Sequence, residues 1–180
     1  MTEKLHKSTK NLKKATLSCI IDSEAKMSKE KYKQIISLIL IIIWMITVFM
    51  FSNQNGDESQ KTSNTVTKVI VRILTFNQEI TEEQELKSIE DLDFVIRKLA
   101  HYSIYLLGGI LIWGYINTFD IAIKKKIIIS IIIGAAYATF DELHQYFIAN
   151  RSANIIDVSI DSIGVITGVA LMQIKAKIKP

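Results

Sequence analysis

The sequence predicts an all-α protein: an integral membrane four-helix bundle with an extracellular helical connection between its first two transmembrane helices. Hydrophobic residues make up 49 % of the 180 residues, and the mean hydropathy of +0.25 is high for a soluble protein. The apolar residues also gather in long blocks, whereas amphipathic helices or strands would show periods of 3.6 or 2. The length allows one domain. Together these observations favour membrane spans.

The first span is expected at residues 35–51, after a basic tail at residues 1–34. The tail holds nine lysines and four acidic residues, and we expect a solvated cytosolic segment with a little helix. A helix as long as residues 35–51 rises about 25 Å, just enough for a hydrocarbon core. Because this apolar block begins late and lacks a small-residue cleavage site, we interpret it as a retained anchor.

Residues 52–96 form the longest polar connection of the chain. Its beginning is rich in Ser, Asn and Gln, which is typical of a turn. Residues 65–74 then place Val, Ile and Leu on one helical face, which predicts a helix. Residues 65–93 would lie on the membrane interface or cover the site as a lid, and both alternatives stay open. Thr81 and Gln84 match a capping box that would open a further, acidic helix.

Three more spans are predicted at residues 99–119, 127–147 and 155–174. A short lysine-rich loop at residues 120–126 separates the first two of these, and a basic tail at residues 175–180 ends the chain. Gly164 and Gly168 are four residues apart in the last span. Such small-residue pairs allow two membrane helices to approach closely.

The distribution of charge predicts which end of each span faces the cytosol. Fifteen of the 22 lysines and arginines lie in the N-terminal tail, the 120–126 loop and the C-terminal tail. The positive-inside rule therefore places both termini in the cytosol, in agreement with four spans. The polar residues near the spans then all fall at the outer ends of their helices.

Helical spacing groups these polar residues into three stripes. Arg97, His101 and Tyr105 are four residues apart, as are Asp141 and Gln145, and Asp157 and Asp161. Ionisable groups at membrane depth are costly unless they are paired, hydrated or functional, so we expect the stripes to face each other. The predicted ligand-binding residues are Arg97, His101, Tyr105, Asp141, Glu142, Gln145, Arg151, Asp157 and Asp161.

Three segments carry a resemblance to a known family. They are SNQ at residues 52–54, RKLAHYSIYLLG at 97–108 and DELHQYFIANRSANIIDVSIDSIG at 141–164. As an ordered set they resemble the VanZ-like family of small bacterial membrane proteins, and the corresponding membrane domain would cover residues 35–174. The family usually has Asn where this chain has Asp161. The resemblance implies the plasma membrane of a bacterium and a role in the cell envelope; the founding member is associated with teicoplanin resistance.

The first interpretation of the polar residues is a binding site without catalysis. Arg97, Lys98 and Arg151 would pair with the phosphate or carboxylate groups of an anionic amphiphile. Besides membrane lipids, a lipid-linked cell-wall precursor or a lipoglycopeptide would fit a site in the outer leaflet.

The second interpretation is a membrane-embedded hydrolase or transferase that acts on a lipid-linked envelope substrate. His101 would be the general acid or base, with Glu142 or Asp141 as its partner. No cofactor and no metal are expected, because the H-E-x-x-H pattern is absent and His144 is off the face of Asp141.

The third interpretation is a structural clamp, in which ion pairs such as Arg97–Asp157 and Arg151–Glu142 only hold helices together. A nucleic-acid partner is not expected, because the Lys-rich segments flank apolar blocks and lack interleaved aromatic residues. The oligomeric state is left open.

Overall fold

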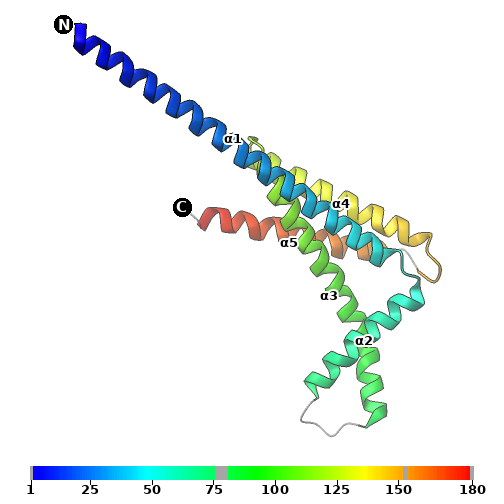
Figure 1. The fold of residues 1–180 in the computed structure, drawn as a ribbon. Helices are drawn as coiled ribbons and strands as arrows, with labels where there is room; N and C mark the ends of the chain where they lie inside the picture. The colour runs from blue at the N-terminus through cyan, green and yellow to red at the C-terminus, as the bar shows by residue number, and fades with distance from the viewer. Residues whose placement is uncertain (1, 76–80, 152–153, 179–180) are drawn as a thin grey trace.

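The computed structural model describes residues 2–75, 81–151 and 154–178, and all the regular structure within them is helical. The helices are α1 (Thr2–Ser52), α2 (Gly56–Leu74), α3 (Glu82–Ile116), α4 (Ile123–Tyr146) and α5 (Ile155–Ile178). Helices α1, α3, α4 and α5 gather into a bundle, and α2 with the first half of α3 projects beyond it (Figure 1). The all-α prediction is confirmed.

Four segments are long and apolar enough to cross a membrane. They are Glu24–Ser52, Leu86–Ile116, Ile123–Tyr146 and Ile155–Ile178. Many of their Ile and Leu side chains point away from the bundle and are exposed to the surroundings. A bilayer would cover such surfaces, so the chain is a multi-pass membrane protein.

The basic tail is more helical than the expectation of a little helix. Helix α1 begins at Thr2 and continues without a break through the first span to Ser52. Residues 2–34 contain no Gly or Pro, and an existing helix extends far more readily than a new one nucleates. The span therefore carries helix into the tail. The cytosolic location of this tail stays a prediction.

Helix α3 packs most closely against α5. A Cβ atom at Gly164 would overlap the carbonyl oxygen of Tyr102, and one at Gly168 would overlap that of Leu106. The missing side chains let the two backbones touch, as small residues do in membrane bundles. The packing role predicted for Gly164 and Gly168 is confirmed.

Gly164→Ala is expected to destabilise the bundle by about 1–3 kcal/mol, because its methyl group meets rigid backbone of α3. The matched control is Gly114→Ala, since a Cβ atom at Gly114 meets nothing within 4 Å. Thermal unfolding in detergent measures both variants. Equal unfolding temperatures for the two would contradict the close α3–α5 contact.

Helix α1 is attached to α3 through Trp44, which is 4 % exposed. Its indole N–H donates a hydrogen bond of 2.9 Å to the carbonyl oxygen of Ile104. Its ring packs edge-on against Tyr105, with 5.7 Å between ring centroids, and covers Gly108. This contact places the end of α1 beside the middle of α3.

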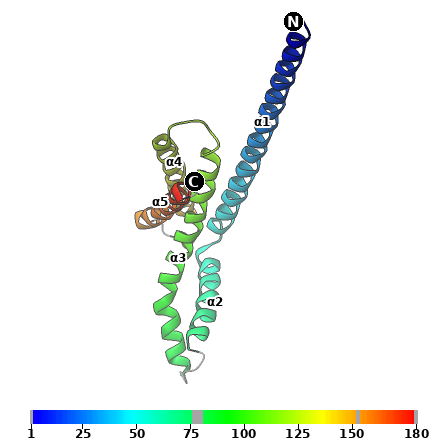
Figure 2. The ribbon, with the colours of Figure 1, turned by 90° about the vertical axis from the view of Figure 1, so that its left-hand side faces the viewer.

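Helices α2 and α3 form a hairpin that extends away from the bundle (Figure 2). Asp93 of α3 is buried there and accepts hydrogen bonds from Gln60 (2.8 Å), Ser63 and Thr67 (3.3 Å) of α2. The capping box predicted from Thr81 and Gln84 opens α3 and is confirmed. Helix α2 starts nine residues before the predicted interfacial helix, at Gly56.

Candidate functional site

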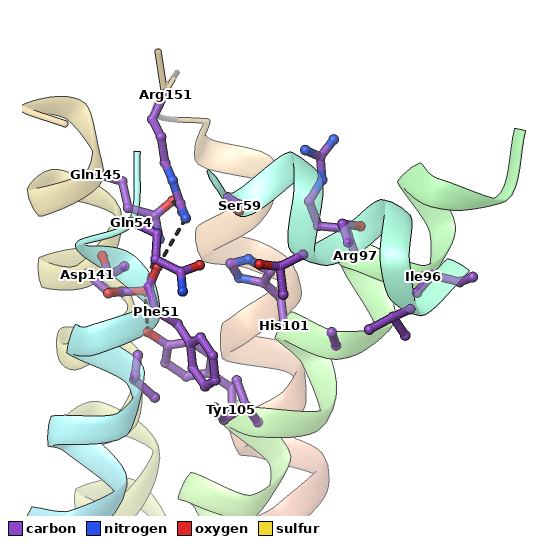
Figure 3. A pocket seen from close by; sticks show the side chains of 17 residues that line it. Phe51, Gln54, Ser59, Ile96, Arg97, His101, Tyr105, Asp141, Gln145 and Arg151 are labelled. Carbon is purple, nitrogen blue, oxygen red and sulfur yellow. Dashed lines mark hydrogen bonds between the residues drawn. The ribbon is translucent and has the colours of Figure 1, made fainter. Parts of the chain in front are cut away.

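Two neighbouring cavities lie where the hairpin joins the bundle. The first, of about 240 Å³, has a mainly apolar wall and is called the apolar cavity (Figure 3). The second, of about 270 Å³, has a mainly polar wall and is called the polar cavity. Apolar side chains in the first include Val48, Phe51, Val66, Ile96 and Ile104. Residues that line both cavities are Ser59, Arg97, His101, Gln145 and Arg151.

Arg151 reaches the cavities from the loop that follows α4. The loop turns at Asn150, whose φ of 59° is in the left-handed region that Asn tolerates better than most residues. Its position is tied to the start of α2, because the Gly56 N–H donates to the Ala149 carbonyl oxygen at 3.1 Å. Asn150 Nδ2 also donates to Asp57 at 3.1 Å.

The Arg151 guanidinium crosses from this loop to the end of α1. One terminal nitrogen donates to Gln145 Oε1 at 2.7 Å, and the other donates to the Phe51 carbonyl oxygen at 3.1 Å. Figure 3 shows the side chain hanging down toward Gln54 and Gln145. These contacts join the end of α4 and the loop that follows it to the end of α1, which is about 100 residues earlier in the sequence.

Arg97 stands on the other side of the cavities, on α3. One of its terminal nitrogens donates to Gln60 Oε1 of α2 at 3.1 Å. Within the described parts of the chain, neither Arg97 nor Arg151 has a carboxylate within ion-pair distance. The predicted pairs Arg97–Asp157 and Arg151–Glu142 are therefore not formed.

The environment of Arg151 reflects this lack of a close partner. Burial lowers the pKa of its guanidinium below the ordinary value, and the positive charge of Arg97 acts in the same direction. The more distant carboxylates of Asp141 and Glu142 act against both. Two like charges thus face both cavities, and no described residue places a counter-charge in contact with either.

Three carboxylates near the site are occupied by donors other than the two arginines. Asp157 pairs with Lys98, and Glu142 accepts a 2.5 Å hydrogen bond from the backbone N–H of Asn154. Asp141 accepts hydrogen bonds from the Tyr105 hydroxyl at 3.0 Å and from Gln145 Nε2 at 3.2 Å. The amide of Gln145 thus donates to Asp141, one helix turn earlier, and accepts from Arg151 in the loop after α4.

Asp161 lies deeper, beneath His101. It is 1 % exposed, and His101 Nδ1 is 3.6 Å from one of its oxygens, an ion-pair distance longer than a hydrogen bond. Neither carboxylate oxygen has a hydrogen-bond partner among the described residues. Such a buried carboxylate is costly unless a positive group approaches it.

The structure brings seven of the nine predicted site residues to the cavity walls. Tyr105 and Asp141 line the apolar cavity and Asp157 lines the polar cavity, while four residues line both: Arg97, His101, Gln145 and Arg151. Glu142 and Asp161 line neither and lie behind the walls. The ligand-binding role of all nine stays a prediction.

The sequence interpretation missed the contribution of α2. Ser59 and Gln60 of α2, and Gln54 just before it, line the cavities, but their polar stretch indicated only a turn. The sequence did contain a helix signal, namely Asn55 with Glu58 three residues later. In the structure Asn55 caps α2 and accepts a hydrogen bond of 2.8 Å from the Glu58 N–H. Asn followed by Glu three residues later is typical of a helix start.

His144 does not belong to the site. Its ring stacks on Phe49 of α1, with 4.8 Å between ring centroids, and it lines neither cavity. Among the residues that the structure describes, no three His, Cys, Asp or Glu side chains converge in a way that would hold a metal ion.

Comparison with known proteins places the chain in a family. No curated protein and no solved structure gives a significant match. A model of the VanZ/LLP1 family matches residues 37–176, which include at least part of every helix of the bundle and all residues of the cavities. Since this match covers well over half of the sequence, the protein belongs to the VanZ/LLP1 family.

Proposed function

We propose that this protein binds an anionic amphiphile, with the headgroup in the polar cavity and part of the chain in the apolar cavity. The observation that carries the proposal is the pair of arginines, Arg97 and Arg151, which face shared cavity space and, among the described residues, donate hydrogen bonds only to neutral acceptors.

The anionic headgroup of the ligand is inferred from the positive charges of Arg97 and Arg151. A guanidinium that is partly removed from water gains most from an ionised acceptor, and its planar fork suits phosphate and carboxylate. Arg97 and Arg151 each spend hydrogen bonds on neutral oxygens, from Gln60, Gln145 and Phe51. An anion between the two guanidiniums would supply the charge that these acceptors lack.

The lipid chain of the ligand is inferred from the apolar cavity. Its wall carries side chains such as Val48, Phe51 and Ile104 from the membrane spans, directly beside the shared cationic residues. A site with an apolar wall and a few convergent polar groups favours a molecule that has an apolar part and a polar part. A free inorganic anion would leave this wall unused.

We place the site on the outer side of the plasma membrane of a bacterium, with both termini cytoplasmic. The support is the charge of the loops: the lysine-rich 120–126 loop and both tails are at the ends of the spans opposite to the cavities. Candidate ligands there are a lipid-linked cell-wall precursor or a lipoglycopeptide of the teicoplanin type, both of which combine an anionic group with a lipid chain.

Binding to the protein in lipid nanodiscs tests the two halves separately. Farnesyl phosphate has a chain and a charge, farnesol has only the chain, and inorganic phosphate has only the charge. Farnesyl phosphate is expected to bind at least about tenfold more tightly than either, because both cavities contribute. Equal affinity for farnesol would show that the arginines do not hold the headgroup.

A further inference from the structure

His101 lies where the two cavities meet, and its ring has two different edges. Nδ1 faces Asp161 at 3.6 Å. Asp161 lines neither cavity, whereas His101 lines both. The edge that carries Nε2 is therefore directed at the cavity space, and Figure 3 shows the ring standing between Arg97 on one side and Gln54 with Gln145 on the other.

Asp161 is suited to hold this imidazole in one form. A carboxylate at Nδ1 keeps a proton on that nitrogen, leaves a lone pair on Nε2 and stabilises the imidazolium when Nε2 takes up a proton. In the described part of the chain, no hydrogen-bond donor competes for the Asp161 oxygens. His101 is thus arranged as a base with its reactive nitrogen toward the ligand.

Three cationic side chains surround the same space. Arg97, Lys98 and Arg151 all line the polar cavity together with His101. A diphosphate carries more negative charge than a monophosphate and extends over more donors, so it can reach both arginines and also Lys98, which shares its charge with Asp157. Guanidinium and ammonium groups around a phosphoryl group are also what stabilises the charge of phosphoryl transfer.

We propose that the protein hydrolyses a lipid diphosphate to the lipid monophosphate, with His101 as the general base. This proposal rests on the amphiphile binding proposed above. A water oxygen attacks the terminal phosphorus while Nε2 takes one of its protons. The bond from that phosphorus to the bridging oxygen breaks, and its electron pair stays on the lipid monophosphate. Inorganic phosphate leaves, and the proton passes from His101 to solvent.

The choice of a diphosphate over a monophosphate ester follows from the acids in the cavities. An alcohol leaving group needs a proton donor, whereas a phosphate leaving group does not. The acids on the cavity walls are Asp141 and Asp157, and both already accept hydrogen bonds or an ion pair from neighbouring side chains. Neither is arranged to protonate an alkoxide.

The experiment uses the full chain in nanodiscs with farnesyl diphosphate in water enriched in oxygen-18. The expected products are farnesyl monophosphate and inorganic phosphate that carries the label, both measured by mass spectrometry. His101→Gln is expected to lower the rate at least about 100-fold. His144→Gln is the matched control, because His144 stacks on Phe49 away from both cavities, and its rate is expected to match that of the wild type.

Asp161 is a positioning residue, so its variant needs a different readout. Asp161→Asn keeps the shape but removes the charge beneath His101. We expect kcat to fall about tenfold or more while KM changes little, since the substrate does not touch this residue. A rise in KM with unchanged kcat would assign Asp161 to binding and overturn its role in the reaction.

Binding of the methylene analogue of farnesyl diphosphate separates this proposal from the previous one. If the wild type binds the analogue but releases no phosphate from the diphosphate, the hydrolase proposal is wrong and amphiphile binding stands. If the analogue does not bind, both proposals are wrong. Wild-type rates in His101→Gln, or label in the lipid product, would overturn the mechanism.

Discussion

The double variant Arg97→Gln/Arg151→Gln is expected to weaken binding of farnesyl phosphate by about 100-fold or more. A hydrogen bond to a charged group contributes about 1.5–3 kcal/mol, so the loss of two such bonds removes about 3–6 kcal/mol. Each 1.4 kcal/mol is about tenfold in affinity. Equilibrium titration in nanodiscs measures the change, and glutamine keeps the length and polarity of each side chain.

The matched control is Lys124→Gln/Lys125→Gln, which removes the same number of positive charges from the opposite end of the bundle. Both lysines are exposed, in the first turn of α4. Binding to this control is expected to stay within about twofold of the wild type, because exposed charges beyond a Debye length are screened. An equal loss in both variants would trace the affinity to overall charge and not to the two arginines.

Trp44→Ala is expected to give the largest loss of stability among single substitutions in the bundle. Its indole contacts Tyr105, Tyr137 and Gly108 and is almost fully buried. Truncation of such a side chain in a soluble core costs about 3–5 kcal/mol. Lipid tails also solvate apolar groups, so we expect the lower part of that range, measured by unfolding in detergent.

Two further variants separate packing from hydrogen bonding at this position. Trp44→Phe keeps much of the ring but loses the donor to the Ile104 carbonyl oxygen, and about 1 kcal/mol is expected. Ile43→Ala changes the neighbouring side chain, which is 54 % exposed on the surface of α1, and little loss is expected. A large loss in Ile43→Ala would mean that α1 is packed by another face.

The residues that share a face were predictable, but their partners were not. Helical spacing set Arg97, His101 and Tyr105 on one side of their own helix, and the loop charges indicated that the polar ends of the spans are close together. The rotation of each helix against its neighbours depends on packing between residues far apart in sequence. Gly164 sets the distance between α3 and α5 through a backbone contact, and such contacts decide which acid lies nearest to which base.

The choice of Lys98 over Arg97 as the partner of Asp157 illustrates this limit. The two residues are adjacent, so on α3 they point in directions about 100° apart. Helix α2 supplies Gln60 as a neutral partner for Arg97, and α5 brings Asp157 to Lys98. The contribution of α2 was outside the prediction because its polar stretch shows no strong apolar period before Val66.

Helix α3 is longer than the hydrocarbon core of a membrane is thick. Its 35 residues extend about 52 Å, whereas a hydrocarbon core is about 30 Å thick. Counted back from Ile116, that thickness ends near Arg97, and about 20 Å of helix remains beyond it. The beginning of α3, at Glu82, therefore lies past the lipid headgroups. No Gly or Pro interrupts residues 82–107. A partner outside the membrane that bound the beginning of α3 would therefore act on the same continuous helix that carries Arg97 and His101.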